Sequence, residues 1–83
     1  MPKKDTRRKN IVGRRVAEAR KWCNPALTQD GLSGRLARLG IQLDRVAITK
    51  IENANRHVLD YELKALAHAL RVDVNWLLGS DRK

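Results

Sequence analysis

Residues 28–53 constrain the fold more than any other part of the chain. Their sequence, TQDGLSGRLARLGIQLDRVAITKIEN, contains two segments with apolar residues at helical spacing, joined by a turn that includes Gly40. Leu32, Leu36 and Leu39 define the buried face that we expect in the first segment. Two short amphipathic helices of this kind must bury their apolar faces against other helices, so the segment predicts a helical fold.

The second of these segments, residues 44–53, presents a polar face opposite Ile48 and Ile51. Val46, Thr49, Lys50 and Asn53 share that face, at positions i, i+3, i+4 and i+7. A helix of this kind can offer a methyl pair, a hydroxyl, an amine and an amide to base edges or phosphates in a DNA groove. A hydrated surface is the alternative for Thr49 and Lys50, and helix packing is the alternative for Val46.

The composition favours one small all-α domain. The chain has 83 residues, of which 42% are hydrophobic, and it contains no Phe, so Leu, Ile, Val and Ala must fill the core. No alternating pattern runs far enough to suggest a sheet. We therefore predict a compact five-helix bundle over residues 10–79, with a C-terminal tail at 80–83.

The charge of the chain suggests a polyanionic partner. The net charge is +9, of which residues 1–10 contribute 5 − 1 = +4 and the remaining 73 residues contribute +5. The folded part is therefore basic in its own right, as in nucleic-acid-binding domains. Residues 1–9 are expected to form a flexible basic arm. Together with Arg14 and Arg15 the arm can follow phosphates or enter a minor groove, although a merely solvated arm is the plain alternative.

Polar residues at helix ends predict where the helices begin. We expect N-caps at Asn10, Thr28, Asp44, Asp60 and Asp73. Gly40 and Gly79 are suited to helix C-termini. Gly31 and Gly34 weaken the second helix, and we expect their small size to let a neighbouring helix approach closely.

The sequence gives little support to catalysis or metal binding. Cys23, His57 and His68 lack ligand spacings such as CxxC or HExxH, and no Gly-rich phosphate loop is present. We therefore expect no enzyme activity, no cofactor and no small-molecule ligand. A single cysteine, together with the lack of a signal peptide or a long apolar run, favours a soluble intracellular protein.

In the order of its helices and landmarks, the chain resembles the phage repressor and Cro-like regulators, the XRE-type helix-turn-helix family. The resemblance covers about residues 10–79. It rests on Arg20, on Leu27-Thr28-Gln29, on Ile48-Thr49-Lys50-Ile51-Glu52-Asn53, on residues 60–70 and on residues 72–79. The chain between Gln29 and Ile48 is longer than in the compact form of the family, and the glycines at 31 and 34 are unusual there.

The resemblance implies roles for individual residues. It places Gln29 on a DNA phosphate, and it implies that Asn53, Asn55 and Arg56 contact the DNA backbone. Arg45, Val46, Thr49 and Lys50 become candidates for reading base edges in the major groove. Arg20 and Glu52 resemble the family's structural ion pair, which ties the first helix to the third.

The function expected from these features is a sequence-specific regulator of transcription that binds double-stranded DNA. A homodimer on an inverted repeat is expected, since one small module makes few base contacts. The candidate dimer surface is the last helix, with Trp76, Leu77 and Leu78, although these residues can instead close the core. One alternative is an antitoxin-like protein-interaction module with weak, non-specific DNA binding. A basic amphipathic protein of membranes or RNA is a more remote one.

Overall fold

The predicted all-α fold is confirmed by the computed structural model, which describes residues 8–80. This part of the chain holds five helices and no strand. The helices are α1 (Gly13–Trp22), α2 (Gln29–Arg38), α3 (Arg45–Glu52), α4 (Asp60–Leu70) and α5 (Val74–Leu78). Most of the predicted basic arm and of the predicted C-terminal tail lies outside the described residues.

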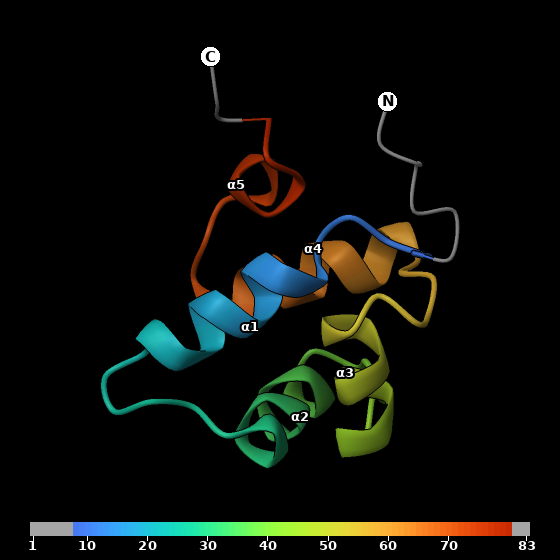
Figure 1. Cartoon of the computed structure of the whole chain (residues 1–83). Coiled ribbons are helices and arrows are strands. Elements are labelled where there is room, and N and C mark those ends of the chain that lie inside the picture. The colour runs from blue at the N-terminus through green and yellow to red at the C-terminus, as the bar shows by residue number, and fades with distance from the viewer. Residues whose placement is uncertain (1–7, 81–83) are drawn as a thin grey trace, which may run out of the picture.

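The helices pack around one core. Figure 1 shows α1 beside α4, with α2 and α3 below this pair in the view and α5 above it. The largest fully buried side chains come from all five helices: Val16, Leu32, Leu36, Ile48, Ile51, Leu66 and Leu77. Burial of each leucine or isoleucine contributes about 1.5–3 kcal/mol, so these contacts hold α2 and α3 in fixed positions.

Three of the predicted N-caps are confirmed. Thr28 Oγ1 accepts a hydrogen bond from the Gly31 N–H at 2.9 Å, and Asp44 Oδ1 accepts one from Ala47 at 2.8 Å. Asp73 Oδ1 does the same for Asn75 at 2.9 Å. Such caps typically contribute about 1 kcal/mol each, and they fix the first residues of α2, α3 and α5.

The predicted N-cap of the first helix was wrong by two residues, because Val12 occupies the N-cap position and Asn10 contacts the start of α1 from further upstream. Its Oδ1 accepts hydrogen bonds from Val12 and Gly13 at 3.0 and 2.8 Å. Its side-chain amide donates to the carbonyl oxygens of Ile51 and Arg56 at 3.1 and 2.8 Å. One side chain therefore joins the start of α1 to the end of α3 and to the segment that follows it.

The predicted cap of α4 was wrong by one residue. Leu59 occupies the N-cap position and Asp60 is the first residue of the helix. The Leu59 N–H donates to Glu62 Oε1 at 3.0 Å, so a carboxylate inside the first turn satisfies the end of the helix.

The expected role of two glycines was also wrong. A Cβ at Gly34 would meet nothing within 4 Å, and one at Gly31 would meet Leu27 Cδ1 at 2.7 Å rather than another helix. The close approach lies at Gly13, where a Cβ would collide with the backbone carbonyls of Ile51 and Glu52. Gly13 is therefore the residue that lets α1 begin directly against the end of α3.

One residue expected to be buried is exposed. Leu39 lies at the end of α2 and is 41% exposed. Ile11 is also exposed, since it precedes the first helical residue of α1. Gly40 and Gly79 adopt positive φ angles of 83° and 79°, as expected for glycines that end helices.

Candidate nucleic-acid interface

The two helices α2 and α3 pack against each other, and α3 is also packed against α1. Ile48 and Ile51 are fully buried, while Val46 on the opposite face is 60% exposed. Lys50 and Arg45 are exposed as well, and Thr49 is half-buried. The amphipathic division predicted for residues 44–53 is therefore confirmed, and it leaves three candidate base-reading side chains open to solvent.

A hydrogen-bonded network supports this face from behind. Arg20 and Glu52 form a two-pronged ion pair, with Nε to Oε2 at 2.7 Å and Nη2 to Oε1 at 3.1 Å. Their side chains are only 13% and 9% exposed. Arg20 also donates to the carbonyl oxygen of Leu27 at 3.0 Å. The ion pair therefore links α1 to α3, as the resemblance implied, and Arg20 also holds the segment before α2.

Gln29 extends the network to the outer face of α3. Its Nε2 donates to Glu52 Oε1 at 3.1 Å, and its Oε1 accepts from the Thr49 hydroxyl at 3.1 Å. A carboxylate can only accept hydrogen bonds, so Glu52 determines which way the Gln29 amide is turned. The single hydroxyl proton of Thr49 is then committed to Gln29, and only the lone pairs of Thr49 remain for an external partner.

Arg45 lies near an acidic neighbour but is not held by it. Arg45 Nη1 is 4.0 Å from Asp30 Oδ2, and the two side chains are 66% and 74% exposed. Ion pairs this long and this exposed contribute little, so Arg45 can turn toward a ligand at small cost. The two residues border a hollow of about 500 Å³ at the N-terminus of α2, which Arg20, Thr28 and Gln29 also line.

Two arginines that the sequence assigned to DNA phosphates have partners within the fold. Arg15 donates to the Trp76 carbonyl oxygen at 2.7 Å, and its guanidinium lies 4.6 Å from the centre of the Trp76 ring. Arg56 forms two hydrogen bonds with Glu62, at 2.8 and 3.0 Å. These contacts give Arg15 and Arg56 structural roles, and a phosphate contact by either residue stays a prediction. Arg14 is exposed and stays a candidate.

The partner of Arg56 was missed because its sequence position suggested a simpler role. Glu62 lies in the first turn of α4, where a carboxylate is favoured by the helix dipole alone. In the fold it is 5% exposed and also accepts from Leu59. Arg56 and Glu62 are six residues apart and are separated by a loop, so their pairing leaves no helical spacing in the sequence. Only the burial of Glu62 in the fold indicates that the pair exists.

The hydrogen bonds from Arg56 lower the pKa of Glu62 below its ordinary value, and the pKa of Arg56 is raised by the same contact. The stabilisation is therefore complete above the ordinary glutamate pKa and is lost as pH falls through the lower pKa of the folded state.

We expect the wild-type protein to have a larger free energy of unfolding than Glu62→Gln at about pH 7. This difference in free energy should become smaller toward about pH 3, where Glu62 is protonated. Urea unfolding at both pH values measures this difference. A difference that does not change with pH would contradict the role of the Glu62 charge. The control is Asp60→Asn, which removes an exposed carboxylate from the same helix.

The loop after α3 keeps two other candidates accessible. Asn53 caps the C-terminus of α3 and is exposed, as is Asn55. The Asn55 N–H donates to the Lys50 carbonyl oxygen at 2.7 Å, and Ala54 between them has a φ of 62°. This turn leaves both amides on the surface beside the end of α3, where a backbone contact remains a prediction.

The candidate dimer residues lie in different environments. Leu77 is 1% exposed and belongs to the core, so it is not available to a partner chain. Trp76 is half-buried, with its ring 5.5 Å from that of Trp22 and against the Arg15 guanidinium. Leu78 is half-buried and packs on the core. Most of this predicted surface is therefore used within the fold.

Within residues 8–80 no group of three His, Cys, Asp or Glu side chains is arranged to hold a metal ion. In the same range no helix combines the length and apolar character needed to cross a membrane. The chain matches no protein-family model, and neither a curated protein nor a solved structure is significantly similar to it.

Proposed function

We propose that this protein is a sequence-specific regulator of transcription that inserts α3 into the major groove of double-stranded DNA. The observation that carries the proposal is the supported outer face of α3. Arg45, Val46 and Lys50 are exposed there, while Gln29 and Thr49 are held by the Arg20–Glu52 pair behind them. Preorganised polar groups on a rigid element are what base recognition requires.

Each side chain on this face suits a different part of a duplex. Lys50 and Arg45 can donate to guanine O6 and N7, and Val46 can pack on a thymine methyl group. Gln29 is the first residue of α2, and backbone N–H groups and the helix dipole favour binding of a phosphate at this end of the helix. The net charge of +9 adds attraction to any DNA sequence.

A homodimer on an inverted repeat, in the cytoplasm of a bacterial cell, completes the proposal. A single α3 contacts only a few base pairs, and two half-sites about one helical turn apart supply the missing affinity and specificity. Because Leu77 is buried, the dimer contact must use other surface residues.

Selection of bound duplexes from a random DNA library tests this function. At near-physiological salt we expect enrichment of an inverted repeat. Binding that enriches no sequence and disappears as salt rises would instead reduce the interaction to charge attraction and contradict the proposal.

Thr49 supplies a more specific prediction within this function. Because its proton is donated to Gln29, Thr49 should accept a hydrogen bond from the exocyclic amine of adenine or cytosine. Thr49→Val should weaken binding to the selected site by about 1 kcal/mol, a typical net hydrogen-bond contribution. On a duplex in which the unsubstituted base purine replaces the contacted adenine, the amine is missing. Wild type and Thr49→Val should therefore bind that duplex with the same affinity.

The control for this experiment is Thr49→Ser, which keeps the hydroxyl and should bind nearly as wild type does. Fluorescence anisotropy measures the affinities of wild type and Thr49→Val for both duplexes. These four values form a double-mutant cycle that isolates the contact between Thr49 and the amine. If the loss instead depended on guanine O6 or thymine O4, the Thr49 hydroxyl would be a donor to the base, which would contradict its predicted role as an acceptor.

A further inference from the structure

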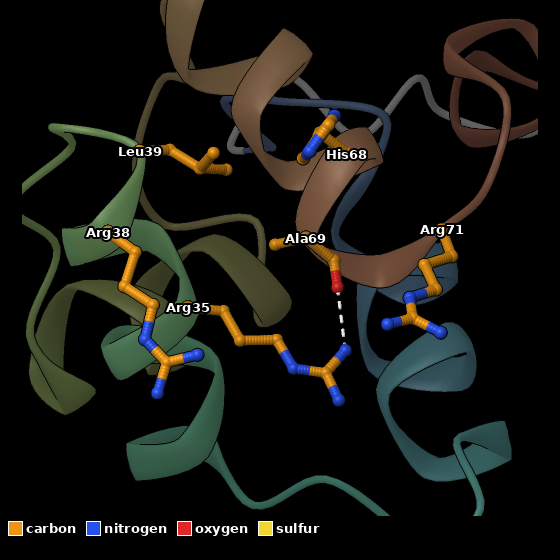
Figure 2. A pocket seen from close by; sticks show the side chains of 6 residues that line it. All are labelled: Arg35, Arg38, Leu39, His68, Ala69 and Arg71. Carbon is orange, nitrogen blue, oxygen red and sulfur yellow. Dashed lines mark hydrogen bonds between the residues drawn. The ribbon is translucent and has the colours of Figure 1, made fainter.

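A groove lined by arginines lies between α2 and α4, and α3 contributes no residue to it. The first part is a hollow of about 300 Å³, lined by Arg35, Arg38, Leu39, His68, Ala69 and Arg71. Figure 2 shows the three guanidinium groups along one side of this hollow, with Arg35 between Arg38 and Arg71. Leu39 and His68 lie at its other end in the same view.

The charge of this hollow is not balanced by the fold. No carboxylate of the described residues lines it, and Arg35 is positioned by a hydrogen bond to the Ala69 carbonyl oxygen at 2.8 Å. The side chains of Arg38 and Arg71 form no ion pair or hydrogen bond with a described residue. Cations near helix C-termini are favourable one at a time, but three together repel one another. An anionic ligand would relieve that repulsion.

The groove continues past the arginines toward the end of α1. A neighbouring hollow of about 230 Å³ shares Arg35 and Arg71 and is also lined by Trp22, Cys23 and Asn24. Large apolar side chains therefore stand at both ends of the groove. Leu39 is 41% exposed and Trp22 is 67% exposed.

We propose that this groove binds an acidic segment of a partner protein, independently of any DNA on α3. Carboxylates would pair with Arg35, Arg38 and Arg71, since the guanidinium fork matches a carboxylate in two-pronged geometry. Apolar side chains flanking those acids would cover Leu39 and Trp22. Arginine and tryptophan are enriched among residues that dominate the energy of protein interfaces.

The apolar ends favour a protein segment over nucleic acid. A phosphodiester backbone can satisfy the three guanidinium groups, but it has no side chains to cover an exposed leucine. A peptide with acidic residues between apolar ones complements both the charge and the two apolar ends of the groove.

Binding of a blocked synthetic peptide of glutamates flanked by leucines tests the proposal. Its affinity is measured by calorimetry for wild type, for the double variant Arg38→Gln/Arg71→Gln, and for Lys9→Gln/Lys64→Gln. The second double variant removes the same charge from exposed residues that line neither hollow. We expect the arginine pair to cost about tenfold or more in Kd and the lysine pair to cost little. Circular dichroism melting checks that both variants are folded.

The other outcomes are also decisive. Equal losses in both double variants would reduce the interaction to net charge and overturn the proposal. A peptide with glutamines in place of the glutamates should fail to bind, and equal binding of that peptide would overturn it as well. If the arginine pair instead lowers the affinity for duplex DNA and leaves peptide binding unchanged, the groove is a nucleic-acid contact.

Discussion

Glu52→Ala should lower the free energy of unfolding by about 3–5 kcal/mol, the usual cost of removing one partner from a buried ion pair. Among residues 8–80, the Arg20 side chain, 13% exposed, would keep only the Leu27 carbonyl oxygen as a partner. Gln29 would lose the acceptor that orients its amide. A domain of this size is stable by only about 5–15 kcal/mol, so the variant should be close to unfolding.

Chemical denaturation followed by circular dichroism measures this effect. The matched control is Asp30→Ala, which removes a carboxylate from an exposed pair 4.0 Å long and should change stability little. DNA binding by Glu52→Ala should fall mainly with the folded fraction. An unchanged denaturation midpoint for Glu52→Ala would show that the pair does not hold α1 and α3 together.

Gly13→Ala should destabilise the protein by about 1–3 kcal/mol or more, as expected when atoms are forced into a packed region. The new Cβ would lie 2.8 Å from the Glu52 carbonyl oxygen and closer still to that of Ile51. These are backbone atoms at the end of α3, and Asn10 donates to the same Ile51 oxygen at 3.1 Å. They cannot retreat without disturbing both the Asn10 contact and the position of Glu52.

Gly34→Ala should change the stability in the opposite direction to Gly13→Ala. Gly34 is exposed in the interior of α2, and a Cβ there would meet nothing within 4 Å. Its higher helix propensity should stabilise the protein by up to about 1 kcal/mol. Thermal unfolding of both variants gives the comparison. A Gly13→Ala variant as stable as wild type would contradict the close contact between α1 and α3.

The helices could be predicted from the sequence because their ends are fixed by local interactions. Thr28, Asp44 and Asp73 each cap a helix through an N–H two or three residues away. Such contacts are visible as short-range patterns. Leu59 escaped prediction because a leucine has no capping oxygen, and the carboxylate that satisfies it lies inside the helix at Glu62.

The long-range contacts could not be predicted from periodicity. Arg15 and Trp76 are 61 residues apart, so an arginine beside a basic arm gave no sign of its partner. The role of Gly13 depends on where the end of α3 lies, which only the packed fold determines. The Arg20–Glu52 pair, 32 residues apart, was predicted only through a resemblance to a known family.

The central claim is that side chains on the outer face of α3 determine which DNA sequence is bound. The most direct measurement is duplex selection carried out in parallel with wild type and with Lys50→Gln. Lys50 is exposed and makes no side-chain hydrogen bond with a described residue, so the substitution should leave the fold intact. We predict that the preferred base changes at one symmetric pair of positions, while the rest of the inverted repeat is retained. The same selected sequence, bound more weakly throughout, would show that α3 contacts only phosphates and would contradict the claim.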